Sequence, residues 1–129
     1  MKSTSIRTPI GKVRGLGSAK SGTEHWWEMR LTSIALLPLT LAAIVIVISL
    51  IGRNHAAVVQ ILGSPFVAIT MLLWVYTVTL HMRLGLQSVI EDYIHGKAMK
   101  TGLLIANTFL TIVVWLACTY AILKLSFGV

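Results

Sequence analysis

The sequence predicts an all-α membrane protein with three transmembrane helices, from its composition, its hydropathy and three long uncharged runs. Of its 129 residues, 56% are hydrophobic and only 12% are charged, and the mean hydropathy is +0.83. A soluble domain of this length would carry more charge, so the chain is expected to form one integral membrane unit. The net charge of +7 would also fit nucleic-acid binding, but membrane topology explains it better in so apolar a chain.

Residues 1–24 are predicted to form a flexible basic arm. The segment holds five Lys or Arg residues, four glycines and no acidic residue before Glu24. It lacks the apolar core of a secretory signal. Its composition is shared with mitochondrial transit peptides, yet its glycine and proline content disfavours an amphipathic helix. We therefore expect the arm to stay on the positively charged side of the membrane.

The first membrane helix is predicted over about residues 26–52. It contains the uncharged run Leu31–Ile51, which is 21 residues long and spans the hydrocarbon layer of roughly 30 Å at about 1.5 Å per residue. Trp26 and Trp27 precede it as interfacial anchors. Pro38 should kink this helix, because proline lacks the N–H that an inner helical turn requires.

The other two helices of the anchor domain, residues 25–129, follow a short polar turn at residues 52–55. The second is expected over about 64–95, with Ser64 as N-cap before Pro65 and with a glycine, Gly96, as its C-terminal stop. The third is expected over about 98–125. Because the second helix is longer than one crossing requires, its C-terminal end should emerge at the membrane surface.

Basic residues predict the orientation of the chain. Besides the five in the arm, Lys97 and Lys100 lie on the side of the N-terminus, with Arg30 at the boundary. The opposite side has only Arg53 and Lys124. By the positive-inside rule, the N-terminus faces inside and the C-terminus faces outside.

The second helix carries an unusual polar stretch from His81 onward. At about 100° per residue, His81, Gly85, Ser88 and Asp92 share one helical face, while Tyr93 lies about 120° round from His81 and roughly 16 to 18 Å along the axis. Polar residues at membrane depth are costly and mark functional sites. A histidine one turn from a glycine offers a ring nitrogen beside bare backbone, which suits a flat haem macrocycle.

Structural roles remain open for the same side chains. His81 could be a hydrogen-bonded packing residue and Gly85 a close helix contact. Arg83 points about 200° away from His81 and could extend toward the inner surface as a structural residue. Asp92 and Tyr93 could simply lie at the interface.

Other residues have simple structural interpretations. Arg30 could be an ordinary basic flank of the first helix. Cys118, the single cysteine, excludes an internal disulfide, a four-thiolate iron–sulfur site and a zinc cluster, and is expected to be a small buried apolar residue. The remaining histidines are expected in loops or at interfaces, in contact with solvent: His25, His55 and His95.

Two motifs resemble the hydrophobic membrane-anchor subunit of succinate dehydrogenase, of the smaller or D type. One is His81-x3-Gly85-x3-Val89-x2-Asp92-Tyr93 on the second of three helices, and the other is His25-Trp-Trp-Glu-Met-Arg30-Leu-Thr32 at the entry to the first. The resemblance covers nearly the whole chain from about residue 22. The spacing of the histidine and the Asp-Tyr pair in so short a chain is fairly specific.

The resemblance implies roles for five residues. His81 would be one axial ligand of haem b, with the second ligand supplied by the partner anchor subunit, and Gly85 would pack on the haem. Tyr93 would donate a hydrogen bond to a ubiquinone carbonyl, with Asp92 beside it. Arg30 would lie near the haem propionates.

The same resemblance implies a place in respiratory complex II of the bacterial cytoplasmic membrane, in preference to the mitochondrial inner membrane. The partners would be a C-type anchor subunit, an iron–sulfur subunit and a flavoprotein subunit, and only these last two would carry the iron–sulfur clusters and FAD. The chain would dock those subunits and shape part of the ubiquinone site, and alone it would catalyse nothing.

Two other classes remain as alternatives. A homodimeric b-type cytochrome would place two copies of His81 across a twofold axis. A small cofactor-free transporter or membrane adaptor would use His81, Arg83 and Asp92 as a proton or ion relay. The near absence of charge in the first and third helices offers such a relay little pathway.

Overall fold

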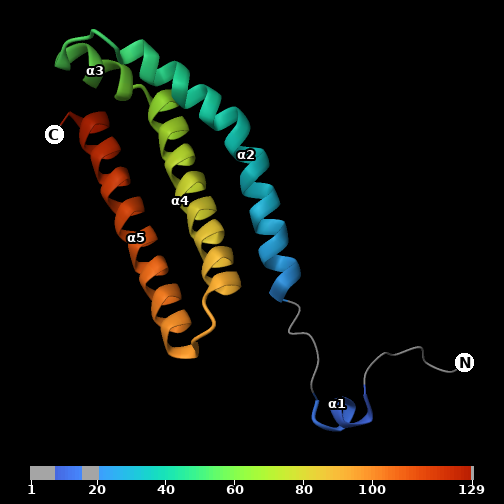
Figure 1. Ribbon diagram of the computed structural model, residues 1–129. Helices are drawn as coiled ribbons and strands as arrows, with labels where there is room; N and C mark the ends of the chain where they lie inside the picture. The colour runs from blue at the N-terminus through green and yellow to red at the C-terminus, as the bar shows by residue number, and fades with distance from the viewer. Residues whose placement is uncertain (1–7, 16–20, 129) are drawn as a thin grey trace, which may run out of the picture.

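The computed structural model describes residues 8–15 and 21–128, which form helices and connecting turns without a strand (Figure 1). Along the chain the helices are α1 (Pro9–Val13), α2 (Ser21–Leu50), α3 (His55–Leu62), α4 (Pro65–Tyr93) and α5 (Lys97–Phe127). Three of them, at Gly22–Leu50, Pro65–Tyr93 and Lys97–Phe127, are long and apolar enough to cross a membrane. The predicted all-α membrane class with three spanning helices is confirmed.

The boundaries of α4 and α5 lie within two residues of the prediction, whereas α2 begins earlier than expected. It starts at Ser21 in place of residue 26 and ends at Leu50 in place of residue 52. Glu24 lies in its first turn, where its carboxylate interacts favourably with the positive end of the helix dipole. Gly52, with φ of 74°, occupies the left-handed region just beyond the end of α2.

Part of the segment expected to be a flexible arm is helical. Helix α1 forms after Thr8, whose Oγ1 accepts a hydrogen bond from Gly11 N at 3.2 Å, and Pro9 occupies the first turn. Proline suits that position because its φ is already helical and its missing N–H has no helical partner there. The expectation for residues 1–7 and 16–20 lies outside the described part of the chain.

Helices α2, α4 and α5 lie in one layer with α4 in the middle (Figure 1). Helix α4 packs against both neighbours, and α2 and α5 have no contact over the described residues. The membrane-spanning stretch of α4 is 22% buried, against 11% for each of the other two. A single layer leaves both of its faces open, so most of its apolar surface remains available to lipid or to another subunit.

Contacts across the α2–α4 interface include one from an indole. Trp74 Nε1 on α4 donates to Thr40 Oγ1 on α2 at 3.1 Å.

Helix α2 also contains Pro38, and it changes direction near its middle (Figure 1). The expected kink follows from the backbone hydrogen bond that proline cannot donate.

The short helix α3 was not predicted; the sequence indicated only a polar turn at residues 52–55. Asn54 begins this helix, and its side chain accepts from Ala57 N at 2.9 Å. Helix α3 contacts α2, α4 and α5 at one end of the layer. Its last residue, Leu62, is buried, and Leu62 O accepts a hydrogen bond from Ser126 Oγ of α5 at 3.0 Å.

The turn between α4 and α5 differs from the prediction in its glycine. Helix α4 ends at Tyr93 with Ile94 as an extended C-cap, while Gly96, with φ of −71°, is the N-cap of α5 and no left-handed stop for α4. Lys100 Nζ reaches back to Glu91 O at 3.0 Å. A lysine that the sequence indicated only as a topology signal therefore fixes the end of α4.

Candidate functional site

His81 lies at the interface between α4 and α2. Its Nδ1 is 3.0 Å from Oγ1 of Thr32, across the two helices. Thr32 is buried, with 7% of its surface exposed, and His81 is half-buried. His81 therefore makes the interhelical hydrogen bond of its structural alternative, while its role as a haem ligand stays a prediction. The partner is a residue that appeared in the sequence only as the end of the entry motif.

Gly85 leaves open space on the same side of α4. A Cβ added there would meet nothing within 4 Å. Gly85 lies one turn from His81 and about 40° round the helix. A side chain at Gly85 would therefore meet no other helix among the described residues of this chain. The histidine and the open backbone patch fit a flat ligand that lies against α4.

Asp92 and Tyr93 form a separate location at the C-terminal end of α4. Both are exposed, Tyr93 by 76%. The helical rise puts them roughly 17 to 18 Å along the axis from His81. The Lys100–Glu91 contact lies beside them in the turn to α5. One helix therefore holds the two candidate locations at a fixed separation.

Arg30 is not brought to His81 within this chain. Its guanidinium carbon lies 4.9 Å from the ring centroid of Trp26, and the residue is exposed. Arg30 is two positions from Thr32, so it points about 160° away from the α4 side of α2. An arginine stacked on a tryptophan at this end of α2 is available to an anionic group outside the chain.

The other histidines divide into two kinds. His55 and His95 are exposed, as expected. His25 differs, because its Nε2 is buried and has no hydrogen-bond partner among the described residues. The early start of α2 makes His25 helical, and seven residues separate it from Thr32, which puts both on the α4-facing side.

A pocket of about 300 Å³ lies between the N-terminal end of α2 and the facing part of α4. Its lining from α2 is polar and includes His25, Glu24 and Glu28, while α4 contributes Arg83 and Gln87. Arg83 is therefore level with the polar entry of α2. The sequence alone could not place these residues together, because their proximity depends on how two helices pair.

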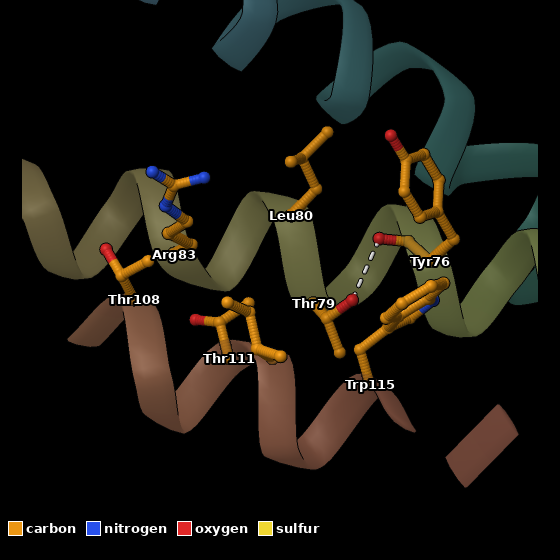
Figure 2. Close-up of a pocket in the computed structure, with 8 residues that line it drawn as sticks. Tyr76, Thr79, Leu80, Arg83, Thr108, Thr111 and Trp115 are labelled. Carbon is orange, nitrogen blue, oxygen red and sulfur yellow. Dashed lines mark hydrogen bonds between the residues drawn. The ribbon is translucent and has the colours of Figure 1, made fainter. Parts of the chain in front are cut away.

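Arg83 also borders a second pocket, of about 240 Å³, between α4 and α5 (Figure 2). Figure 2 shows its side chain above the groove, with Thr108 and Thr111 across from it on α5. Tyr76 and Trp115 close the apolar end in an edge-to-face contact at 6.3 Å. Since Arg83 lies about 160° round α4 from His81, this groove is on another side of the helix.

One buried amide joins α4 to α5. Asn107 is 6% exposed, and its Nδ2 donates to Arg83 O at 3.0 Å. Its Oδ1 has no hydrogen-bond partner in the described structure. A helix carbonyl that accepts a second hydrogen bond ties the two helices without disturbing the helical ladder, because a carbonyl oxygen has two lone pairs.

Clusters that could hold a metal ion by themselves are absent from residues 8–15 and 21–128. No three His, Cys, Asp or Glu side chains there come together. Cys118 is partly buried in α5 and is a free thiol. A metal ion bound at His81 would therefore need ligands from a macrocycle or another chain to complete its coordination.

The fold and the site define an integral membrane protein with three spanning helices, in which His81 joins two of them and the end of the same helix bears Tyr93. The family model described as succinate dehydrogenase/fumarate reductase transmembrane subunit matches residues 4–123. The chain belongs to this family.

Three similar proteins carry names that agree with this family assignment. A succinate dehydrogenase hydrophobic membrane anchor subunit of Paracoccus denitrificans is 31% identical over 94% of this chain and 93% of its own length. The subunit of the same name from Rickettsia bellii is 33% identical over 89% of this chain and 94% of its own. The mitochondrial succinate dehydrogenase [ubiquinone] cytochrome b small subunit of Bos taurus is 33% identical over 70% of this chain and 48% of its own.

These comparisons confirm the resemblance inferred from the His81 and Asp92-Tyr93 spacing. The three apolar helices and the Paracoccus and Rickettsia relatives place the chain in the bacterial inner membrane.

Proposed function

We propose that this chain is a membrane-anchor subunit of a succinate:ubiquinone oxidoreductase, in which it supplies one haem b ligand and part of the ubiquinone site. The observation that carries the proposal is the His81–Thr32 contact beside the open Gly85 patch, on a helix whose end bears Asp92 and Tyr93. Membership of the family gives the complex to which these residues are assigned.

His81 would hold the haem through a ring nitrogen, and Gly85 would let the macrocycle approach the α4 backbone. A bound haem b supplies a one-electron carrier. No group of three His, Cys, Asp or Glu side chains comes together among the described residues, and the other haem ligand would come from a C-type anchor subunit packed on this face. Arg30, exposed and outside the α2–α4 interface, would reach the haem propionates in that assembled bundle.

The ubiquinone site is proposed at the exposed end of α4. A tyrosine side chain combines an apolar ring with a polar tip, which suits the lipid boundary, and its O–H would donate to a quinone carbonyl oxygen that gains charge on reduction. Asp92 lies next to it in the chain and provides a carboxylate that orients the site or passes a proton. Lys100, bonded to Glu91 O, holds the end of α4 in position.

This assignment sets the orientation of the chain. The N-terminal end of α2 and the α4–α5 turn face the cytoplasm, and the C-terminus faces outside. The iron–sulfur subunit then docks at the Tyr93 end, with the flavoprotein subunit beyond it. FAD and the iron–sulfur clusters belong to those partners, and this chain catalyses nothing alone.

A mild-detergent pull-down of the tagged chain, followed by a reduced-minus-oxidised visible spectrum, tests the proposal. We expect flavin, iron–sulfur protein and a b-type haem band in one complex. A single polypeptide without flavin, cluster or haem absorbance would overturn the assignment. A haem band in the chain expressed alone would identify a homodimeric cytochrome in its place.

A further inference from the structure

We propose that Thr32 is a positioning residue that fixes both the tautomer and the direction of the His81 ring, so that Nε2 is the nitrogen presented to the haem iron. The inference rests on the proposed function, because it takes haem as the group that His81 binds. It is carried by the hydrogen bonds around one oxygen, Thr32 Oγ1.

Thr32 Oγ1 lies within hydrogen-bond distance of three atoms. They are Glu28 O at 2.8 Å, Met29 O at 3.1 Å and His81 Nδ1 at 3.0 Å. A threonine hydroxyl has one hydrogen to donate and two lone pairs with which to accept. The two carbonyl oxygens only accept, so the single hydrogen must point toward them. Toward His81, Thr32 Oγ1 therefore acts as the acceptor.

The opposite arrangement is unfavourable. If His81 Nδ1 were bare, the hydroxyl hydrogen would have to turn to it. Thr32 Oγ1 would then face Glu28 O at 2.8 Å with no hydrogen between two acceptors. Thr32 is buried, so bulk water does not relieve that contact. The geometry thus assigns the proton of neutral His81 to Nδ1 and leaves the lone pair on Nε2.

Two features keep Thr32 in this position. Its Cβ is branched, and the bond from its hydroxyl to the carbonyl four residues earlier selects a rotamer in a helix. The residue is also buried in the α2–α4 interface. A ring N–H donated to a fixed protein acceptor is how metal-bound histidines are usually oriented, and it raises the basicity of the ligating nitrogen.

Removing the acceptor should have two measurable effects. The His81 ring would be free to turn and to change tautomer, so haem retention should weaken by about 10- to 100-fold, the range for loss of such an outer partner. The ligand that remains would donate less electron density to the iron. Because electron donation from the ligand stabilises ferric haem more than ferrous haem, a weaker donor should make the midpoint potential more positive.

The test uses the complete complex with Thr32→Val, which keeps the side-chain shape and removes the hydroxyl. Thr32→Ser retains the hydroxyl and should keep haem content and midpoint close to the parent values. Thr40→Val is the matched control, because Thr40 also lies on α2 and accepts from Trp74 Nε1 of α4 at 3.1 Å, but does not bond to His81. Haem per complex is measured after a detergent wash, and the midpoint by redox titration of the haem band.

We expect Thr32→Val alone to lose haem and to shift the midpoint upward. Parent-like haem content and midpoint in Thr32→Val, or equal shifts in Thr40→Val, would overturn the inference. Should Thr32→Val fail to assemble, Thr32→Cys replaces it with the same two expected shifts, because its thiol is only a weak acceptor.

His81→Ala separates this inference from the proposed function. Full haem retention in His81→Ala would show that His81 is not the ligand, and the proposed haem assignment would fall together with the role of Thr32. Loss of haem in His81→Ala, combined with control-like behaviour in Thr32→Val, would reject only the role of Thr32.

Discussion

Thr32 and His81, 49 positions apart in the chain, meet at 3.0 Å between Oγ1 and Nδ1 and join α2 to α4. The Thr40–Trp74 bond lies eight residues further along α2 and seven residues back along α4. Nearly equal spacing in opposite directions is what two antiparallel helices require. These two polar contacts fix the register of the pair, and with it the position of His81.

Replacement of His81 by alanine should remove most of the haem signal from the purified complex. The imidazole is the candidate iron ligand at membrane depth, and alanine offers no donor atom. Reduced-minus-oxidised spectra at equal protein concentration measure the effect. His95→Ala is the control, because His95 is exposed beyond the end of α4 and should keep the signal. Loss of haem in His95→Ala instead would contradict the assignment by depth.

Gly85→Leu should block haem incorporation while leaving the helix intact. A Cβ at Gly85 meets nothing within this chain, and leucine raises helix propensity by about 1 kcal/mol relative to glycine. The bulky side chain would occupy the space proposed for the macrocycle. Gly102→Leu on α5 is matched, since its Cβ also meets nothing within 4 Å. Equal haem content in the two variants would count against a haem face at Gly85.

Tyr93→Phe should slow ubiquinone reduction roughly two- to tenfold, since it removes one hydrogen bond worth about 0.5–1.5 kcal/mol. The haem spectrum should be unchanged, because Tyr93 lies about three helical turns from His81 on α4. Quinone-dependent succinate oxidation is the measurement. Tyr120→Phe serves as control, as Tyr120 is also exposed but belongs to the far end of α5. Parent-like quinone kinetics in Tyr93→Phe would exclude a direct role.

Gly63→Ala should destabilise the turn between α3 and α4 by about 1–3 kcal/mol, the usual cost of overpacking. The added Cβ would lie 2.8 Å from Val59 O and 3.4 Å from Ser126 O. Thermal unfolding of the complex in detergent should show a lower midpoint temperature. Gly96→Ala has its nearest contact at 3.8 Å and should behave like the parent. Equal midpoints in both variants would refute the close packing of Gly63.

Helix α3 and the start of α2 could not be predicted from sequence patterns. Helix α3 has only eight residues between polar or glycine-containing segments, and this is too short for a hydropathy signal, although Asn54 before Ala56-Ala57 is an N-cap pattern. His25 was expected to be solvated, but the earlier start of α2 turns it toward α4. Because α2 starts five residues earlier than predicted, His25 belongs to the helix and not to the loop before it. The position of the helix start therefore decided whether His25 faces solvent or α4.

The sequence by itself determined the three spanning helices and the shared face of His81, Gly85 and Asp92. Backbone N–H and C=O groups in lipid must form hydrogen bonds with one another, so long uncharged runs become helices. The 3.6 residues per turn of a helix then fix which side chains share a face. Only the tertiary structure decided that α4 lies between α2 and α5, that Thr32 is the partner of His81, and that Arg83 borders two pockets. Helix surfaces in a membrane are almost equally apolar, so hydropathy cannot choose their neighbours. Individual steric fits and hydrogen bonds between helices make that choice.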